Sequence, residues 1–197
     1  MKIRLIATIV IIIFFINLGK FLDTTSKAKK SDVIFSLGGY GNERVIKSLN
    51  LLQNDYSKSN TLYLSAKEHL KNIDQKSYNI KYVSYLQNTM AEILYIQYLI
   101  EKHHYDSVLI VTDPPHSRRV DFMIKEFIPE INGKYMIVSS DAQWWKTSSY
   151  FMNSHAFFFS LSEMLKIFYN YLKYTYKSIF NEEYQIEFRE IIDANEK

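Results

Sequence analysis

The amino-acid sequence predicts an α/β fold: a Rossmann-like three-layer sandwich with a mainly parallel sheet, preceded by one N-terminal transmembrane helix. Short apolar runs alternate with longer segments whose apolar residues recur every three or four positions, which is typical of buried strands alternating with helices. The first such run, residues 33–37, ends at Gly38-Gly39, a turn signal. An almost wholly apolar stretch, 5–22, precedes it. Strands that alternate with helices indicate a parallel sheet covered on both faces.

The elements of the body follow from local patterns. We expect strands at residues 33–37, 61–64, 80–85, 107–112 and 135–138. We expect helices at residues 43–52, 89–101, 116–127 and 154–174. In the helix at 89–101, Ile93, Ile96 and Leu99 share one face. Asp113-Pro114-Pro115 ends the strand before it, because proline cannot extend a central strand.

The N-terminal segment is long enough to cross a membrane. At 1.5 Å per residue, residues 5–22 span about 27 Å, close to the thickness of a hydrocarbon core. Lys2 and Arg4 favour an N-terminus kept inside, so we expect a single-pass protein of the cell membrane with its domain outside the cytoplasm. A cleaved signal peptide is the main alternative, since Ser26-Lys27-Ala28 has the small-x-small form of a cleavage site, and the domain would then be secreted. A buried core helix is the third interpretation.

Length and composition indicate one globular domain. We divide the 197 residues into an anchor or signal peptide at 1–22, a polar linker at 23–30, an α/β domain at 31–175 and a charged C-terminal extension at 176–197. The chain has no cysteine, which excludes disulfides and thiolate chemistry. Six of the 24 basic residues and one of the 21 acidic residues lie in the first 30 positions, so the remainder carries a net charge of −2. A nucleic-acid partner is therefore not expected, because it would require positive charge on the folded domain.

The first candidate site segment follows the first strand. Ligands of parallel α/β sheets bind beyond the carboxyl ends of the strands, which here places interest on residues 38–44, 65–68 and 113–119. Gly38-Gly39 leads into a helix N-terminus, where free amides favour an anion. The spacing fits no nucleotide-binding motif, and a tight turn that needs glycine explains the pair equally well.

The second candidate segment, 113–119, places a carboxylate, an imidazole and two guanidinium groups within one turn of helix. His116 is a candidate general acid or base, or a phosphate donor; a capping contact is the alternative. Arg118 and Arg119 point about 100° apart on a helix, so we expect one to face the site and the other to lie on the surface.

Two features of the C-terminal half are also informative. Glu163 lies among aromatic residues of the last helix, where a buried carboxylate needs a partner, and Arg44 and Arg119 are the candidates. Trp144-Trp145 either packs against that helix or dips toward lipid headgroups. His69 and His155 lack metal-ligand spacing with any carboxylate, so no metal site is expected.

Several of these motifs together resemble the YdcF-like family, which includes the SanA and ElyC envelope proteins. The resemblance covers residues 32–172 or so and rests on Leu37-Gly38-Gly39, Glu43-Arg44, Asn88-Thr89 at a helix start, Val111-Thr112 followed by His116 and Arg118-Arg119, and Glu163 in the last helix. It implies a Rossmann-like fold behind a single transmembrane anchor and a link to cell-envelope or peptidoglycan-precursor metabolism. Ala66 stands where the family usually has glycine, and Glu92 where asparagine is common.

Three features together predict an envelope-biogenesis protein whose cleft binds a phosphate-bearing ligand, such as a lipid-linked cell-wall precursor. They are the N-terminal anchor, the glycine turn at Gly38-Gly39 and the segment that carries His116, Arg118 and Arg119. The expected ligand-binding residues are Gly38, Gly39, Arg44, Ser65, Asn88, Thr89, Thr112, Arg118 and Arg119. If the protein is an enzyme, we expect a hydrolase or transferase acting on a phosphorylated envelope precursor, with His116, Asp113 and Glu163 as catalytic residues and with His116 and Asp113 as the acid/base pair. We expect the membrane as a partner, and no cofactor.

Two other functions remain open from the sequence. The first is a non-catalytic scaffold or sensor of the cell envelope, in which loss of His116 would leave function intact. The second, a nucleotide or S-adenosylmethionine binder, follows from fold analogy alone, and the diagnostic glycine spacing is absent.

Overall fold

The predicted α/β, Rossmann-like fold is confirmed by a computed structural model, which describes residues 2–39, 41–65, 78–176, 188–192 and 194–195. The sheet has five strands in the order β3-β2-β1-β4-β5, and every pairing is parallel. The strands are β1 (Val33–Ser36), β2 (Thr61–Leu64), β3 (Asn79–Tyr82), β4 (Val108–Thr112) and β5 (Tyr135–Ser139). Each predicted strand is present to within a few residues at its ends.

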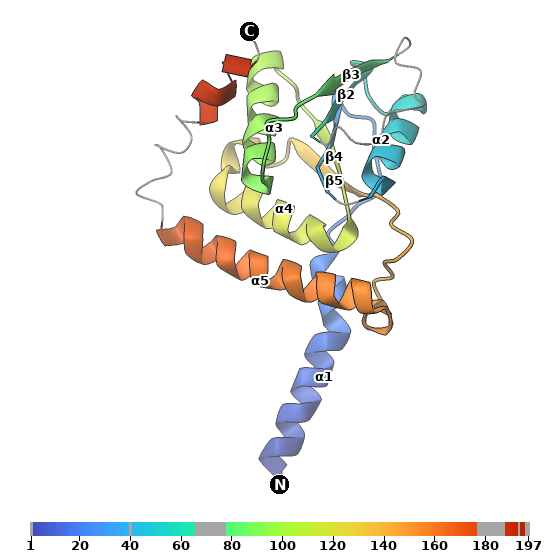
Figure 1. Cartoon of the computed structure of the whole chain (residues 1–197), viewed down its shortest axis with the longest axis vertical. Helices are drawn as coiled ribbons and strands as arrows, with labels where there is room; N and C mark the ends of the chain where they lie inside the picture. The colour runs from blue at the N-terminus through green and yellow to red at the C-terminus, as the bar shows by residue number, and fades with distance from the viewer. Residues whose placement is uncertain (1, 40, 66–77, 177–187, 193, 196–197) are drawn as a thin grey trace.

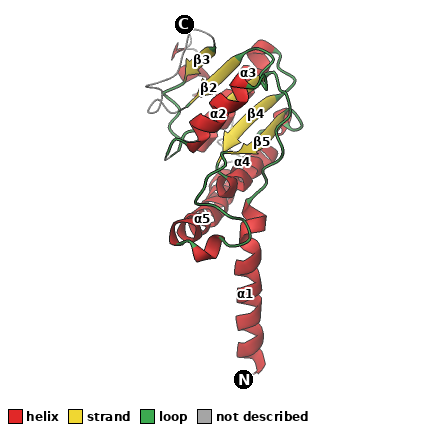
Figure 2. Ribbon diagram, turned by 90° about the vertical axis from the view of Figure 1, so that its right-hand side faces the viewer, coloured by secondary structure: helices red, strands yellow, loops and turns green. Residues whose placement is uncertain are grey.

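Helices cover both faces of the sheet, and two further helices lie at one end of the molecule (Figures 1 and 2). The α-helices are α1 (Lys2–Leu22), α2 (Glu43–Gln53), α3 (Thr89–His103), α4 (Pro114–Phe127) and α5 (Ser154–Tyr176), with short 3-10 helices η1 (Pro129–Ile131) and η2 (Tyr150–Met152). Helix α4 begins two residues earlier than the sequence predicts, because proline fits the first turn of a helix, where its missing N–H is not needed.

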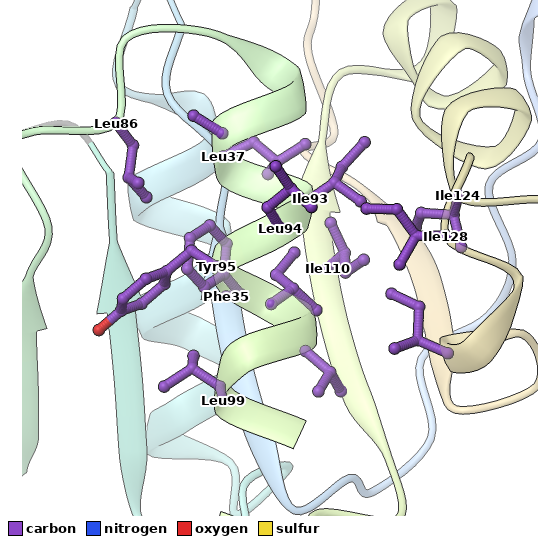
Figure 3. Close-up of a cluster of buried hydrophobic side chains, with 14 of the residues drawn as sticks. Phe35, Leu37, Leu86, Ile93, Leu94, Tyr95, Leu99, Ile110, Ile124 and Ile128 are labelled. Carbon is purple, nitrogen blue, oxygen red and sulfur yellow. The ribbon is translucent and has the colours of Figure 1, made fainter. Parts of the chain in front are cut away.

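The core is split by the central strand β1, whose residues are all buried. Val33 and Phe35 face the side covered by α3 and α4, in the cluster drawn in Figure 3. Ile34 faces the opposite side and packs with residues of α2. A strand buried on both faces is apolar along most of its length, which is why β1 and β4 read as apolar runs, ended by Ser36 and Thr112, instead of alternating patterns.

Strand order places the switch point of the sheet between β1 and β4. The chain leaves β1 toward β2 and β3 and then returns to β4 on the other side of β1. Ser36 at the end of β1 lies opposite Val111, so the carboxyl ends of the two strands meet at one edge. The loops that follow both strands open at that edge, where α/β folds bind their ligands.

The end of α1 is built into the domain. Leu18 and Leu22 are buried together with Trp145 and Tyr150. Gly19 allows this close approach, because a Cβ at that position would lie 2.2 Å from the carbonyl oxygen of Thr147. The last turn of α1 is therefore part of a packed core and not a free stalk.

The segment predicted as a polar linker, 23–30, also makes specific contacts. The Thr24 amide donates to Oγ of Ser117 at 2.8 Å, and the Ser26 amide donates to the Ile137 carbonyl at 2.8 Å. In the predicted C-terminal extension, Phe188 and Ile192 are buried in the cluster that contains α3. Residues 66–68 of the second candidate loop lie outside the described residues.

Candidate functional site

Polar side chains gather where β1, β4 and β5 end and where α2, α3 and α4 begin, with α5 contributing from outside the sheet. They form two buried charge groups and a glycine turn. The first group joins Arg44 of α2 to Asp113 at the end of β4, the second joins His116 and Arg119 of α4 to Glu163 of α5, and Glu92 of α3 occupies the turn.

The first group is an ion pair closed by a hydroxyl. One terminal nitrogen of Arg44 lies 2.7 Å from Oδ2 of Asp113, and Oγ of Ser140 donates to the other carboxylate oxygen at 2.6 Å. The second terminal nitrogen donates to the carbonyl of Gly38. A Cβ on Gly39 would lie 2.6 Å from Cζ of Arg44, so glycine is what lets the guanidinium lie against the turn.

The second group centres on Glu163, which is almost fully buried. Nδ1 of His116 lies 2.9 Å from Oε2 of Glu163, and Nε of Arg119 donates to the same oxygen at 2.7 Å. Arg119 also donates to Oγ1 of Thr89 at 3.0 Å, and Nζ of Lys166 reaches Oε1 of Glu163 at 2.9 Å. Because the carboxylate accepts, we place the proton of neutral His116 on Nδ1, which leaves Nε2 as an acceptor.

The charges of this group follow from burial and from Arg119. Burial and, to a smaller extent, the charge of Arg119 lower the pKa of His116 to about 4, and Glu163 only partly opposes the shift. Burial opposes ionisation of Glu163, but the hydrogen bond from His116 and the nearby Arg119 outweigh it and hold the pKa of Glu163 below its usual range. At neutral pH the group is thus a neutral imidazole oriented by an ionised carboxylate, the arrangement of a general base.

The glycine turn is occupied by a side chain of the protein itself. Oε1 of Glu92 accepts from the Gly38 amide at 2.6 Å and from Oγ of Ser65 at 2.5 Å. A Cβ on Gly38 would lie 2.9 Å from Oγ of Ser65, which explains the need for glycine there. Burial raises the pKa of Glu92, and the hydrogen bonds from Ser65 and Gly38 offset this in part. This carboxyl group takes the amide that the sequence assigned to an anionic ligand.

Three buried polar atoms at the switch point have no hydrogen-bond partner within the described part of the chain: Oγ of Ser36, Oγ1 of Thr112 and Nε of Arg44. Ser36 ends β1 and Thr112 ends the adjacent strand β4. A buried polar atom without a partner costs free energy, so such atoms are uncommon in folded proteins. A ligand that reached the ends of β1 and β4 would supply the partners that these three atoms lack.

The two helix N-termini at the site differ in the free backbone amides that they offer to an anion. Helix α4 starts with Pro114-Pro115, which lack N–H groups, and the amides of His116 and Ser117 are bonded to the Asp113 carbonyl. Helix α2 starts after Asn42, whose side chain makes no capping hydrogen bond. The first-turn amides of α2, beside Arg44, are thus the better anion-binding group of the two.

Several predicted site residues meet here, and others do not. Arg118 lies on the surface, where Nε donates to the Phe21 carbonyl at 2.6 Å, as the 100° separation from Arg119 predicts. Asn88 caps α3 by accepting from the Ala91 amide at 3.0 Å. Asp113 pairs with Arg44 and Ser140, whereas the partner of His116 is Glu163.

Sequence reasoning missed three members of the site. Glu92 lies four and seven positions before Ile96 and Leu99, on the apolar face of its helix, and a carboxylate on such a face is a detectable signal. Ser140 directly follows β5 and was detectable by the strand-end rule. Lys166 follows Glu163 by three positions on α5, a spacing that allows an ion pair.

The described residues of the site include no group of side chains arranged to hold a metal ion. No cluster of three or more His, Cys, Asp or Glu side chains suited to a metal ion occurs among the described residues. The glycine turn that would approach a dinucleotide is filled by Glu92 and Arg44.

Comparison of the chain with protein-family models, curated proteins and solved structures gives no match. The fold and the site together define the class: a Rossmann-like α/β protein with a buried, charged site at its switch point. One helix, Arg4–Leu22, is long and apolar enough to cross a membrane.

Proposed function

We propose that the protein is a membrane-anchored protein of the cell envelope that binds a phosphate-bearing ligand, such as a lipid-linked cell-wall precursor, at the carboxyl ends of β1 and β4. The observation that carries the proposal is the set of unpartnered atoms of Ser36, Thr112 and Arg44 at the switch point. Two hydroxyl groups, a guanidinium N–H and the uncapped start of α2 match the acceptor-rich surface of a phosphate.

The proposed location outside the cytoplasm rests on the N-terminal segment. Lys2 and Arg4 precede the apolar part of α1 and favour retention of the N-terminus inside. Leu18 and Leu22 support an uncleaved anchor, because cleavage near Ala28 would remove two buried core residues. The resemblance to the YdcF-like family supports the proposed link to cell-envelope metabolism.

If the ligand is turned over, His116 is the proposed general base. Nε2 has no hydrogen-bond partner among the described residues and is available to take a proton from water or from a hydroxyl group that attacks phosphorus. Glu163 holds the ring in position, so it acts through His116. Glu92, whose pKa is raised, is the proposed proton donor to a leaving oxygen.

A non-catalytic module is the second candidate, and the burial of the charge group favours it. His116 is only 3% exposed, and Arg119 already has partners in Glu163 and Thr89. On this alternative, the His116 group fixes α5 to α4 and the ligand is bound without reaction.

Ligand binding to the full chain in nanodiscs tests the proposal. We would follow thermal unfolding with inorganic phosphate, a polyprenyl phosphate and a sugar nucleotide; a site-specific ligand at 100 times its dissociation constant adds about 2.7 kcal/mol. Thr112→Val keeps the volume and removes an unpartnered hydroxyl, so the unliganded melting temperature should hold while the ligand-induced rise falls. Arg118→Gln, which removes a surface guanidinium, is the matched control and should leave that rise intact.

Turnover separates the two candidates. Release of phosphate that is lost in His116→Asn, with binding retained, supports an enzyme. Binding without release, unchanged in His116→Asn, supports the scaffold. Absence of any melting shift with all three ligands, from a folded chain, contradicts the phosphate site itself.

A further inference from the structure

The outer face of α5 is apolar, although it points away from the protein. Ala156, Ser160 and Glu163 lie on the buried side of the helix, against α4 and the core. The opposite side carries exposed apolar and aromatic residues: Phe158, Leu165, Phe168, Tyr169 and Leu172. A surface helix of a soluble domain normally turns polar residues to this side. Large exposed apolar patches of this kind mark protein or membrane contacts.

The outer face of α5 lies at the end of the domain that carries the N-terminal helix α1. Helix α5 crosses the end of the domain from which α1 projects, in both views (Figures 1 and 2). The two helices also touch, since the ring of Phe15 lies 5.9 Å from that of Phe157. Because α4 covers the inner side of α5, the apolar face is turned away from the sheet, to the side of α1. Exposed Phe151 and Met152 of η2 continue the apolar surface next to α1.

The length of α1 indicates how deep this surface lies. Among the described side chains, the first residue of α1 with a hydrogen bond or ring contact to the rest of the chain is Phe15, whose carbonyl accepts from the Tyr150 hydroxyl. The freely projecting part, residues 2–14, is about 20 Å long at 1.5 Å per residue. A hydrocarbon core is about 30 Å thick. The projecting part, which includes the charged residues Lys2 and Arg4, therefore falls short by at least about 10 Å, unless the base of the domain enters the bilayer.

Charge on α5 suits a lipid surface as well. Its only acidic residue, Glu163, is buried, and its other charged residues are Lys166 and Lys173. Tyr169 favours the interface between headgroups and chains, and Phe168 is typical of the apolar face of a helix that lies there. Amphipathic helices that lie in this interface sink about 5–10 Å, which matches the missing length of α1.

We propose that the outer face of α5, together with η2, lies in the membrane interface and seats the domain on the bilayer surface. The inference rests on insertion of α1 in the proposed function, but not on the phosphate site. One helix then contacts lipid on one face and carries Glu163 on the other, so the site lies close to the headgroups.

Fluorescent labelling of single cysteines tests the inference, because the chain has no cysteine of its own. We would label Leu165→Cys and Leu172→Cys on α5, Ile11→Cys on α1 and, as the water-facing control, Ile46→Cys on α2; all four positions are exposed. Full chains are placed singly in nanodiscs whose lipids carry nitroxide quenchers, and aqueous iodide quenching is measured in parallel.

The labels on α5 are expected to show several-fold stronger lipid quenching than the label on Ile46→Cys and weaker iodide quenching. Iodide quenching of both α5 labels equal to that of Ile46→Cys, with lipid quenching at Ile11→Cys, overturns the interface inference and leaves the anchor intact. Absence of lipid quenching at Ile11→Cys removes the anchor and the inference together. Labels on α5 shielded from both quenchers point to a protein partner and likewise overturn it.

Discussion

Replacement of Glu163 by glutamine tests the buried charge group most directly. Glutamine keeps the volume of the side chain but removes the negative charge that faces Arg119, whose side chain is 13% exposed. Breaking a buried ion pair while its partner stays costs about 3–5 kcal/mol. For a chain of this size, that corresponds to a fall in melting temperature of roughly 6–20 °C.

The assay is thermal unfolding of the full chain in detergent, followed by near-ultraviolet circular dichroism. Lys166→Gln is the matched control, since it removes a half-exposed partner of the same carboxylate and should cost no more than about 1 kcal/mol. The pKa of Glu163 is lowered on folding, so its stabilisation is present above the ordinary carboxyl pKa and is lost as pH falls below it. The wild type and Glu163→Gln should therefore converge in acid. Equal melting of Glu163→Gln and Lys166→Gln at neutral pH would refute the reasoning.

Three further predictions concern other parts of the molecule. Because burial lowers the pKa of His116 from 6.5 to about 4, only the unfolded chain takes up this proton between those pH values. Acidification of the wild type from pH 7.5 to 5 should therefore lower its free energy of unfolding by roughly 2 kcal/mol. In denaturant titrations, His116→Asn should show a flatter pH dependence than the wild type. Gly39→Ala places a Cβ 2.6 Å from Cζ of Arg44 and should destabilise by about 1–3 kcal/mol in the same titration; no change would show that the guanidinium moves freely. Leu22→Ala should cost about 2–5 kcal/mol, whereas Ile16→Ala, at an exposed position of the same helix, should melt like the wild type if packing of α1 is the cause.

The fold could be predicted from the sequence because its signals are local. The apolar runs of β1 and β4 are buried on both faces, and the turn after Gly38 and the double proline after Asp113 end them clearly. Helix periodicity gave the positions of α3 and α5 to within two residues. Packing of the end of α1 into the domain was not predictable in this way, since it depends on contacts with residues more than 100 positions away, such as Tyr150.

The sequence predicted which residues belong to the site better than it predicted which of them pair with one another. The strand-end rule located His116 and Arg119, and the position of Glu163 among aromatic residues of the last helix marked it as a carboxylate that needs a partner. The sequence led us to pair His116 with the nearer of two carboxylates, because Asp113 is three residues from His116 and Glu163 is 47 residues away. Sequence distance favours Asp113, whereas the crossing of α5 over α4 brings Oε2 of Glu163 to 2.9 Å from Nδ1 of His116. The occupation of the glycine turn by Glu92 depends on a similar long-range contact.

The close approach of Gly19 to Thr147 limits how far the domain can move relative to α1. A domain on a flexible tether sweeps a volume set by the length of that tether. A domain clamped to its anchor keeps one height and one tilt, and it explores its surroundings only by lateral diffusion in the plane. In a membrane, its encounters with a lipid-linked molecule would then depend on the surface density of that molecule in the same bilayer.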